Sequence, residues 1–398
     1  MIKATNGRPG QREINNGLVL RTIVRKGEMT RVDLAHETGL TPAAISNITR
    51  ELIERGLLHE AGISRGKRAG ANAYLLDFPH DQPLLGIIHQ GVSALRLALC
   101  NLRGHILARC VIATPTRYSP EWAVARITET LQGLLKNNGY QPDALIGIGA
   151  ALVGLIDGEQ GIVKRAPSLG WEGIAMSAML ERAMHCPVVL ENNVRAMAFG
   201  EALLGNGRDW SDFAFVYVGT GIGSGLVLHG RPYRGAHSGA GEIGHLTVAP
   251  DGEVCSCGNT GCLETIAAEP ALVHHARQRG IELNAQAGGY KKAVEDLASL
   301  ALAGDAQARE IIKSTGESLG TALANLVDLF NPARIVLHGA ITAAGELFFH
   351  AVSQCISRRA FLARDEVVEL VPATFGTDAG LVGAAAIALD TFILAGNS

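Results

Sequence analysis

The stretch HLTVAPDGEVCSCGNTGC, residues 245–262, brings one imidazole and three thiols into a single short segment. These four side chains make a Cys3His set, which is sufficient for a closed tetrahedral zinc site: His245, Cys255, Cys257 and Cys262. Because four protein ligands leave no open coordination position, we expect the zinc ion to be structural. The alternative is three reduced cysteines in a turn, and the spacing supports the cysteines more directly than it supports His245.

The composition is that of a folded protein with two or three domains. The chain has 398 residues, of which 47% are hydrophobic and 18% are charged, which is enough for a sizeable core. The sequence has no apolar run of about 18 residues and no recognisable signal peptide, so we expect no membrane partner and a cytoplasmic location. The other four cysteines are scattered and do not indicate a disulfide framework.

Charge is distributed unevenly along the chain. The net charge is −3, yet residues 1–76 hold 12 Lys and Arg against 7 Asp and Glu, and the remainder holds 23 against 31. A basic N-terminal module on an acidic body is typical of a protein that binds nucleic acid at one end.

The N-terminal segment has the pattern of three short helices followed by a hairpin. The first helix is predicted over residues 11–26, and Thr30 is a good N-cap for the second. The Thr-Pro pair at 41–42 is typical of the start of a third helix, because proline is favoured at the first helical position. Two strand-like runs follow between residues 57 and 78. This layout predicts a winged helix-turn-helix domain over residues 1–78.

The third helix is the predicted recognition helix. Ile45, Ile48 and Leu52 are spaced three and four apart and must face inward to pack the domain. The opposite side would face a major groove of DNA, with Ala43 and Ala44 allowing close approach and three polar side chains able to contact bases or phosphates. These predicted DNA-binding residues are Ser46, Asn47 and Arg50. An ordinary three-helix bundle that binds protein is the alternative.

The predicted wing carries three basic residues at its tip with glycines on either side. They are Arg65, Lys67 and Arg68. A flexible backbone with this charge suits contact with phosphates or with the minor groove.

The pattern changes to alternating strands and helices after a predicted linker at residues 79–83. We expect the following α/β elements: three strands over 84–113, a helix over 122–137, strands at 144–153 and 188–191, a hairpin over 213–228, a helix-rich stretch over 267–329, a strand at 334–337 and a closing helix over 380–394.

Three motifs resemble those of the ROK family of repressors, sugar kinases and open reading frames. GEIGH at 241–245, followed by the cysteine segment and Glu264, is similar to the zinc and sugar signature of the family. GTGIGSG at 219–225 resembles its glycine loop, and ENN at 191–193 resembles its E-N-D sugar motif. The resemblance extends from about residue 11 to the C-terminus, and the winged-helix start is similar to that of the family's regulators.

This resemblance implies an actin-like (ribonuclease H-like) two-lobed α/β sugar-kinase fold with a cleft between the lobes. The first lobe would comprise residues 84–195 with 380–398, and the second would comprise 196–379 and hold the zinc site. By match to the family, the residues that would contact sugar hydroxyls are Asn192, Asn193, Glu242, His245 and Glu264. His245 would bind zinc through one ring nitrogen and sugar through the other. Alternatively, Glu242 and Glu264 brace the zinc loop and the glycine loop is only a tight hairpin.

Two departures from the family pattern bear on catalysis. The kinases use the Asp of E-N-D as a base, whereas Asn193 is a neutral amide that cannot accept the proton. The kinases also use a strand ending in D-x-G-G-T for the ATP phosphates and metal, and the matching stretch GIIHQGVS at 86–93 has no aspartate. We therefore expect no enzyme activity, with a remnant phosphate site at the glycine loop as an alternative. Ser168 replaces a frequent family Asn, so the sugar is not specified.

Together these features predict a sugar-responsive transcription regulator, and specifically a repressor that a sugar or sugar phosphate releases from DNA, with activation as the alternative. We expect a homodimer or homotetramer that places two winged helices on a double-stranded operator. Two rival hypotheses are an active ATP-dependent sugar kinase with an added DNA-binding domain, and a regulator whose sensor lobe binds a partner protein.

Overall fold

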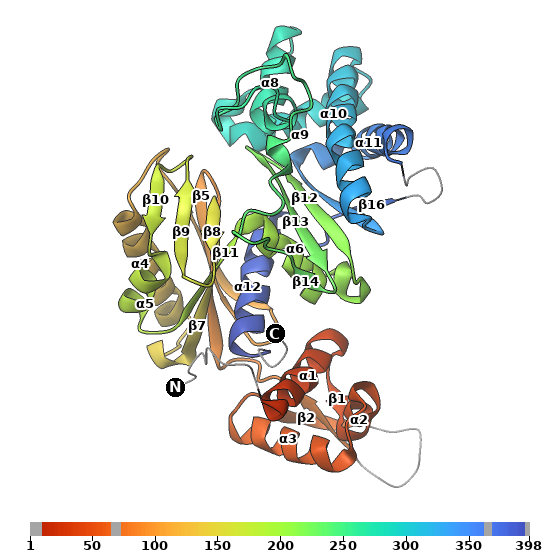
Figure 1. Cartoon of the computed structure of the whole chain (residues 1–398). Helices are drawn as coiled ribbons and strands as arrows, with labels where there is room; N and C mark the ends of the chain where they lie inside the picture. The colour runs from red at the N-terminus through yellow and green to blue at the C-terminus, as the bar shows by residue number, and fades with distance from the viewer. Residues whose placement is uncertain (1–9, 65–72, 362–367, 395–398) are drawn as a thin grey trace. The chain divides into compact units, whose positions relative to one another are not determined.

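The computed structural model of the chain describes residues 10–64, 73–361 and 368–394. The chain divides into two compact units (Figure 1). The first comprises Met1–Arg208 with Gly380–Ser398, and the second comprises Asp209–Ala379. No helix in the described part of the chain is long and apolar enough to cross a membrane.

The N-terminal module has the predicted helices and a small sheet. Its elements are α1 (Gln11–Lys26), α2 (Arg31–Thr38), α3 (Pro42–Glu54), and strands β1 (Met29–Thr30), β2 (His59–Ser64) and β3 (Ala73–Asp77), which pair in the order β1-β3-β2. The predicted caps are confirmed. The Thr30 hydroxyl accepts a hydrogen bond from the Asp33 backbone, and the Thr41 hydroxyl accepts one from Ala44. The predicted winged helix-turn-helix layout is therefore present.

The body of the first unit is a five-stranded mixed sheet between two helical layers. Its strands are β4 (Leu84–Gln90), β5 (Ala94–Cys100), β6 (Ile106–Ala113), β7 (Leu145–Leu152) and β11 (Val188–Asn192), in the order β11-β7-β4-β5-β6. The central β4 is buried at every position, whereas the edge strand β6 alternates with every second residue exposed. The helices around it are α4 (Pro120–Asn137), α5 (Met176–Met184), α6 (Asn193–Leu204) and α12 (Ala379–Phe392).

These helices lie on opposite faces of the sheet (Figure 1). Helices α4 and α5 share one core cluster with β4 and β7. Helix α12 lies on the other face so closely that an added Cβ at Gly149 of β7 would be 2.3 Å from the Ala384 carbonyl oxygen. Helix α6 contacts both β7 and β11. The end of β11, where the ENN motif lies, is thus continuous with α6.

The second unit is built on another five-stranded sheet. Its strands are β12 (Phe213–Val218), β13 (Ile222–Leu228), β14 (Arg231–Pro232), β15 (Arg334–Gly339) and β16 (Glu369–Pro372), in the order β14-β13-β12-β15-β16. The α-helices in its described residues are α7 (Glu264–Ala267), α8 (Glu269–Gln278), α9 (Ala285–Leu302), α10 (Ala306–Phe330) and α11 (Glu346–Arg359). The cysteine segment forms the long connection between β14 and α7.

Some elements were not expected from the sequence. A three-stranded sheet of β8 (Leu155–Asp157), β9 (Ile162–Ala166) and β10 (Trp171–Ile174) follows β7, because such short strands carry too few residues for a clear alternation. The lobe boundary that we placed at residue 195 falls inside α6, whereas the compact units divide at Arg208.

Candidate metal centre and nucleic-acid interface

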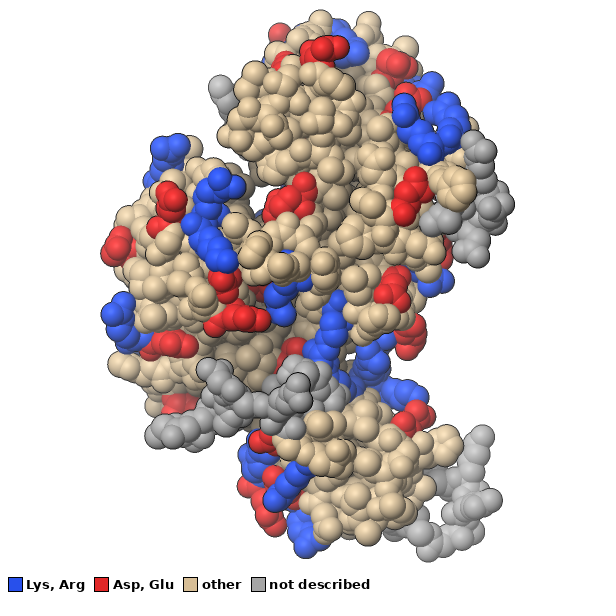
Figure 2. All heavy atoms as spheres, viewed as in Figure 1, with Lys and Arg blue, Asp and Glu red and all other residues tan. Residues whose placement is uncertain are grey.

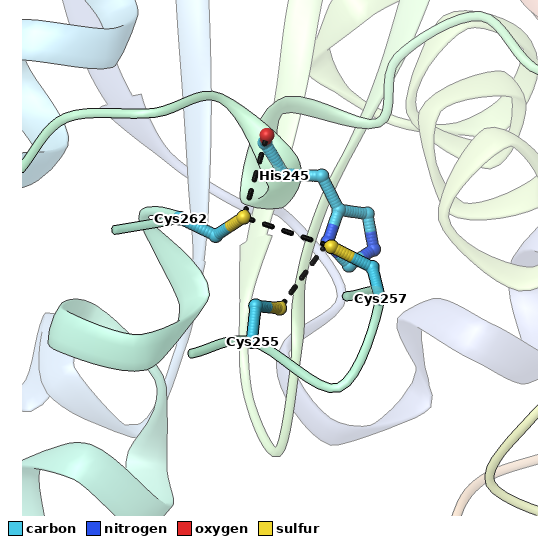
Figure 3. Close-up of side chains that lie close together, drawn as sticks. All are labelled: His245, Cys255, Cys257 and Cys262. Atoms are coloured by element: carbon cyan, nitrogen blue, oxygen red, sulfur yellow. Dashed lines mark hydrogen bonds between the residues drawn. The ribbon is translucent and has the colours of Figure 1, made fainter. Parts of the chain in front are cut away.

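The four predicted metal ligands lie together in the second unit (Figure 3). His245 ends a single 3-10 turn, Ile243–His245, and Cys262 immediately precedes Leu263 at the start of α7. Cys255 and Cys257 occupy a turn closed by a hydrogen bond from the Gly258 backbone N–H to the Cys255 carbonyl, 2.9 Å. Their potential ligand atoms all lie within 4.8 Å of one another, so the group could hold a metal ion.

Two distances within this cluster match those expected around a tetrahedral ion. Zn–S bonds of about 2.3 Å and Zn–N bonds of about 2.0–2.1 Å set neighbouring ligand atoms of a tetrahedron roughly 3.5–3.8 Å apart. The Cys257 and Cys262 sulfurs are 3.7 Å apart, and the Cys255 sulfur is 3.7 Å from His245 Nδ1. Two thiolates at that separation repel one another unless a cation lies between them. Donor type, number and spacing therefore all fit a divalent ion that accepts sulfur and nitrogen ligands.

The backbone of the segment fixes this arrangement. Gly261 has φ +70°, and an added Cβ there would lie 1.5 Å from the Ala249 carbonyl oxygen, so no side chain fits. The Gly261 carbonyl accepts hydrogen bonds from the backbone N–H groups of Val248 and Ala249, at 2.9 and 3.2 Å. These bonds hold the segment that follows His245 against the segment that precedes Cys262. Close backbone approach thus requires glycine at position 261, whereas Gly258 has no neighbour within 4 Å of an added Cβ but has a φ of +94°.

The thiols of the cluster are in different environments. A backbone hydrogen bond from Asn259 lowers the pKa of the exposed Cys257 thiol. Burial, followed by the neighbouring thiols, raises the pKa of Cys262 to about 12. A coordinated metal ion deprotonates a thiol outright, so the buried sulfur needs such an ion to act as a thiolate. Structural Cys3His sites combine these conditions.

The candidate sugar ligand Glu264 contacts the glycine loop. Its Oε2 atom accepts a hydrogen bond from the backbone N–H of Ile222, 3.0 Å away. An added Cβ at Gly221 would lie 2.6 Å from the same oxygen, so the loop must have a glycine there to admit the carboxylate. The loop itself closes with a bond from Gly219 N–H to the Gly221 carbonyl, 2.9 Å. The loop glycines therefore position Glu264, which also lies in the helix that follows the metal ligand Cys262.

Two more candidate sugar ligands begin α6 in the first unit. Asn192 is the N-cap of this helix: its Oδ1 accepts from the backbone of Val194 and Arg195, at 2.9 and 3.1 Å. Its Nδ2 donates to the Gly154 carbonyl, 3.0 Å away. The Asn193 Oδ1 accepts from Val194 at 2.9 Å, and the described residues provide no partner for its Nδ2 group. Asn192 therefore mainly fixes the motif, whereas the Asn193 side-chain donor is not used within the described part of the chain.

A buried ion pair beneath this motif was not assigned from the sequence. Glu191 and Arg195 are each 1% exposed, and Glu191 Oε1 accepts from Arg195 Nε at 2.9 Å. The same Oε1 accepts from the Asn192 backbone at 2.8 Å, so the pair sets the path of the chain into α6. Their i, i+4 spacing is the signal that could have revealed the pair. The fifth candidate, Glu242, is exposed and precedes the turn that ends at His245.

The predicted recognition helix α3 has the expected inner and outer faces. Ile45 and Leu52 are fully buried and Ile48 is 7% exposed, whereas the predicted DNA contacts are exposed: Ser46, Asn47 and Arg50. Arg50 Nη2 donates to Asn47 Oδ1 at 2.5 Å, so these two side chains already share one surface. This surface offers hydrogen-bond donors of the kind that read base edges in a major groove.

The excess positive charge of the module lies outside the described part of the chain. On the face in Figure 2, blue and red side chains of the module are intermixed, and several are paired, such as Arg12 with Glu51 at 2.6 Å. The predicted wing contacts fall outside the described residues: Arg65, Lys67 and Arg68. Their role stays a prediction from the sequence.

Comparisons with known proteins identify both modules. Residues 13–58 match a winged helix-turn-helix DNA-binding model, and residues 85–391 match the ROK family model. Fold and residue pattern therefore define a DNA-binding module joined to a sugar-kinase-like α/β domain. The chain belongs to the ROK family.

Relatives of known role match along most of the chain. A xylose repressor of Caldicellulosiruptor bescii is 29% identical over 89% of this chain and 90% of its own. The DNA-binding transcriptional dual regulator NagC of Escherichia coli is 31% identical over 88% of this chain and 86% of its own.

Solved structures agree in fold. A crystal structure of a ROK family transcriptional regulator, a homologue of E. coli MLC protein, has a TM-score of 0.82 and 31% identity, covering 96% of this chain and 98% of its own. A ROK glucokinase from Streptomyces griseus, in complex with glucose and AMPPNP, has a TM-score of 0.63 and 27% identity, covering 76% of this chain and 98% of its own. The kinase thus matches about the length of the α/β domain, whereas the regulator matches the chain from end to end.

Proposed function

We propose that this protein is a sugar-responsive transcriptional repressor that binds an operator through α3 and is released by a sugar or sugar phosphate. The observation that carries the proposal is the presence, in one chain, of an exposed polar face on a winged-helix recognition helix and of the ROK sugar signature beside a metal-ligand cluster. Relatives that match along most of the chain are named repressors. An operator-binding protein of this kind works in the cytoplasm.

The proposed metal is a structural zinc ion held by the Cys3His cluster. Such an ion would fix the segment between His245 and Glu264 and so position both side chains. Since His245 Nδ1 faces the cysteine sulfurs, its Nε2 atom remains for a sugar hydroxyl. Glu264, oriented by Ile222 N–H, offers a carboxylate acceptor for the same class of ligand. The full set of proposed sugar contacts is Asn192, Asn193, Glu242, His245 and Glu264.

We propose that the sensor domain has no kinase activity. Asn193 cannot serve as a general base, and β4 ends in His89-Gln90 rather than in a carboxylate. The glycine loop is occupied by internal contacts to Glu264. A coupled ATPase assay with a panel of hexoses and pentoses tests this directly, and sugar-dependent turnover would favour the kinase alternative.

The proposed assembly is a homodimer or homotetramer on a two-fold operator, since paired half-sites match paired recognition helices. A sugar can shift the DNA-binding equilibrium only by its difference in affinity for the two states. The protein therefore has to bind its effector more tightly in the DNA-free arrangement.

Selection from a random duplex library, combined with thermal-shift screening of sugars and sugar phosphates, tests the function. We expect one enriched, two-fold symmetric sequence, and one sugar that both stabilises the protein and lowers its affinity for that duplex. Arg68→Ala should weaken binding to every duplex and reduce the salt slope by about 1, whereas Arg126→Ala, on the exposed side of α4, is the matched control. No enriched sequence would refute the DNA-binding role, and no shift with any sugar despite bound zinc would favour a protein effector.

A further inference from the structure

A partly buried ion pair joins the DNA-binding module to the last helix of the chain. Arg21 of α1 pairs with Asp390 of α12, and the two side chains are 14% and 23% exposed. The same Arg21 Nη2 donates to the Leu394 carbonyl at the end of α12, 3.4 Å away. An ion pair with this little solvent exposure is screened less than a surface pair. Arg21 therefore fixes α1 against the C-terminal end of α12.

A second contact joins α1 to the helix that begins at the ENN motif. Helix α1 lies beside α6, and Arg208, just after α6, donates from Nη1 to the Arg25 carbonyl at the end of α1, 3.1 Å away. A third contact lies at the base of the wing, where Arg103 pairs with the buried Asp77 of β3. Three arginines thus connect the DNA-binding module to the first α/β unit.

Helices α6 and α12 are themselves locked together by glycines. An added Cβ at Gly383 of α12 would be 2.5 Å from the Ala196 carbonyl of α6, and one at Gly200 would be 3.0 Å from Gly383 Cα. Residues Val194–Leu203 of α6 are all buried, so this helix has no freedom to move separately from its neighbours. Backbones in such direct contact move as one body, because packed interiors have little room to deform.

Helix α6 begins at a proposed sugar-binding motif, and α12 begins at the end of the second unit. Helix α6 starts at Asn193, and its N-cap is Asn192. Helix α12 starts at Ala379, the residue at which the chain returns from the second unit. With 12 residues, α6 spans about 18 Å, from the ENN motif to Leu204, and Arg208 lies in the turn that follows. Helix α6 therefore runs from the proposed sensor residues toward α1, and α12 runs from the end of the second unit to the contacts with Arg21.

We propose that α6 and α12 form a rigid connector and that Arg21, with Arg208, is the positioning residue through which this connector sets the orientation of the DNA-binding module. The inference rests on the proposed function and specifies its regulation. A ligand at the start of α6, or a shift of the second unit that pulls on Ala379, moves the connector, and the arginines transmit that movement to α1 and so to α3. Allosteric coupling requires an element with two arrangements that both sites bias, and the proposal assigns this role to the connector.

The first test measures coupling in the full-length protein. Binding to the library-selected duplex is titrated with and without D-xylose and N-acetyl-D-glucosamine, for wild type, Arg21→Ala and Arg21→Ala/Arg208→Ala. We expect the sugar-induced change in duplex affinity to fall at least fivefold in the double variant, while the sugar concentration at half-effect stays the same. Arg12→Ala, which breaks an ion pair inside the module, should keep the wild-type response. Arg21→Asp combined with Asp390→Arg should restore it in a protein of wild-type melting temperature.

The second test needs no sugar or DNA. Asn192→Ala removes the cap of α6, and hydrogen exchange reports amide protection in α1. We expect Asn192→Ala to speed exchange in α1 at least threefold when both arginines are present, and to have no effect on α1 in the Arg21→Ala/Arg208→Ala background. Equal effects in both backgrounds, no effect in either, or an unchanged sugar response in the double variant would each overturn the connector. If wild type responds to neither sugar and selects no duplex, the proposed function fails and the exchange experiment alone decides the connector.

Discussion

The metal cluster gives the sharpest quantitative prediction, through the substitution Cys257→Ser. Structural zinc sites contribute apparent binding energies on the order of 10–16 kcal/mol, so one of four ligands carries roughly 2.5–4 kcal/mol by equal division. At about 1.4 kcal/mol for each factor of ten, zinc affinity should fall by about 10² to 10³. Cys257 is exposed, so its replacement leaves no cavity and the effect reports metal binding alone.

The assay is metal content after dialysis against a chelator, followed by thermal unfolding. Wild type should retain one zinc per chain under conditions in which Cys257→Ser loses it. Loss of zinc that was present at about 100 times its Kd removes roughly 2.7 kcal/mol of stability. The second unit should then unfold roughly 5–11 °C lower. Cys110→Ser, at a half-buried position of β6 outside the cluster, is the control and should keep its zinc. The reasoning is refuted if Cys257→Ser holds zinc as firmly as wild type, or if wild type takes up none.

Three further predictions concern other parts of the chain. Arg50→Ala removes a guanidinium from the exposed face of α3 and should cost about 1–3 kcal/mol of affinity for the selected duplex, with little change for random DNA. Gel-shift titration on both duplexes measures this difference, and an equal loss of affinity on both would contradict the prediction. Gly383→Ala places a methyl group against the Ala196 carbonyl and should destabilise the first unit by about 1–3 kcal/mol in urea unfolding. The control Gly133→Ala, where an added Cβ meets nothing within 4 Å, should leave that stability unchanged. Asn193→Asp supplies a carboxylate at the position of the kinase base, yet the variant should show no sugar-dependent ATP turnover because residues 86–93 still lack an aspartate. Turnover in the coupled assay would show that the carboxylate at position 193 was the one missing catalytic group.

Helix caps, helical periodicity and the spacing of cysteines predicted the features of the molecule that depend on residues close together in the sequence. The Thr41-Pro42 start of α3 and its inward stripe depend on capping and helical periodicity, and both are confirmed by the Thr41 hydrogen bond and the burial of Ile45 and Leu52. The four metal ligands lie in one segment, so their spacing was enough to group them.

Contacts between distant segments could not be predicted in this way. Glu264 meets Ile222 across 42 positions, and Arg21 meets Asp390 across 369. No periodicity or cap encodes such pairs, because they depend on where the sheets place each helix. The Glu191–Arg195 pair is an intermediate case, since its i, i+4 spacing is visible but its burial is known only from the fold.

The position of α12 has a consequence for how the protein is made. This helix covers one face of a sheet whose first strand begins at Leu84, yet its own residues start at Ala379. A nascent chain emerging from the ribosome carries the DNA-binding module long before it carries the helix that holds Arg21. Synthesis that stops early therefore yields a module without the Arg21–Asp390 contact, and under the proposed connector such a chain would bind DNA without responding to the sugar.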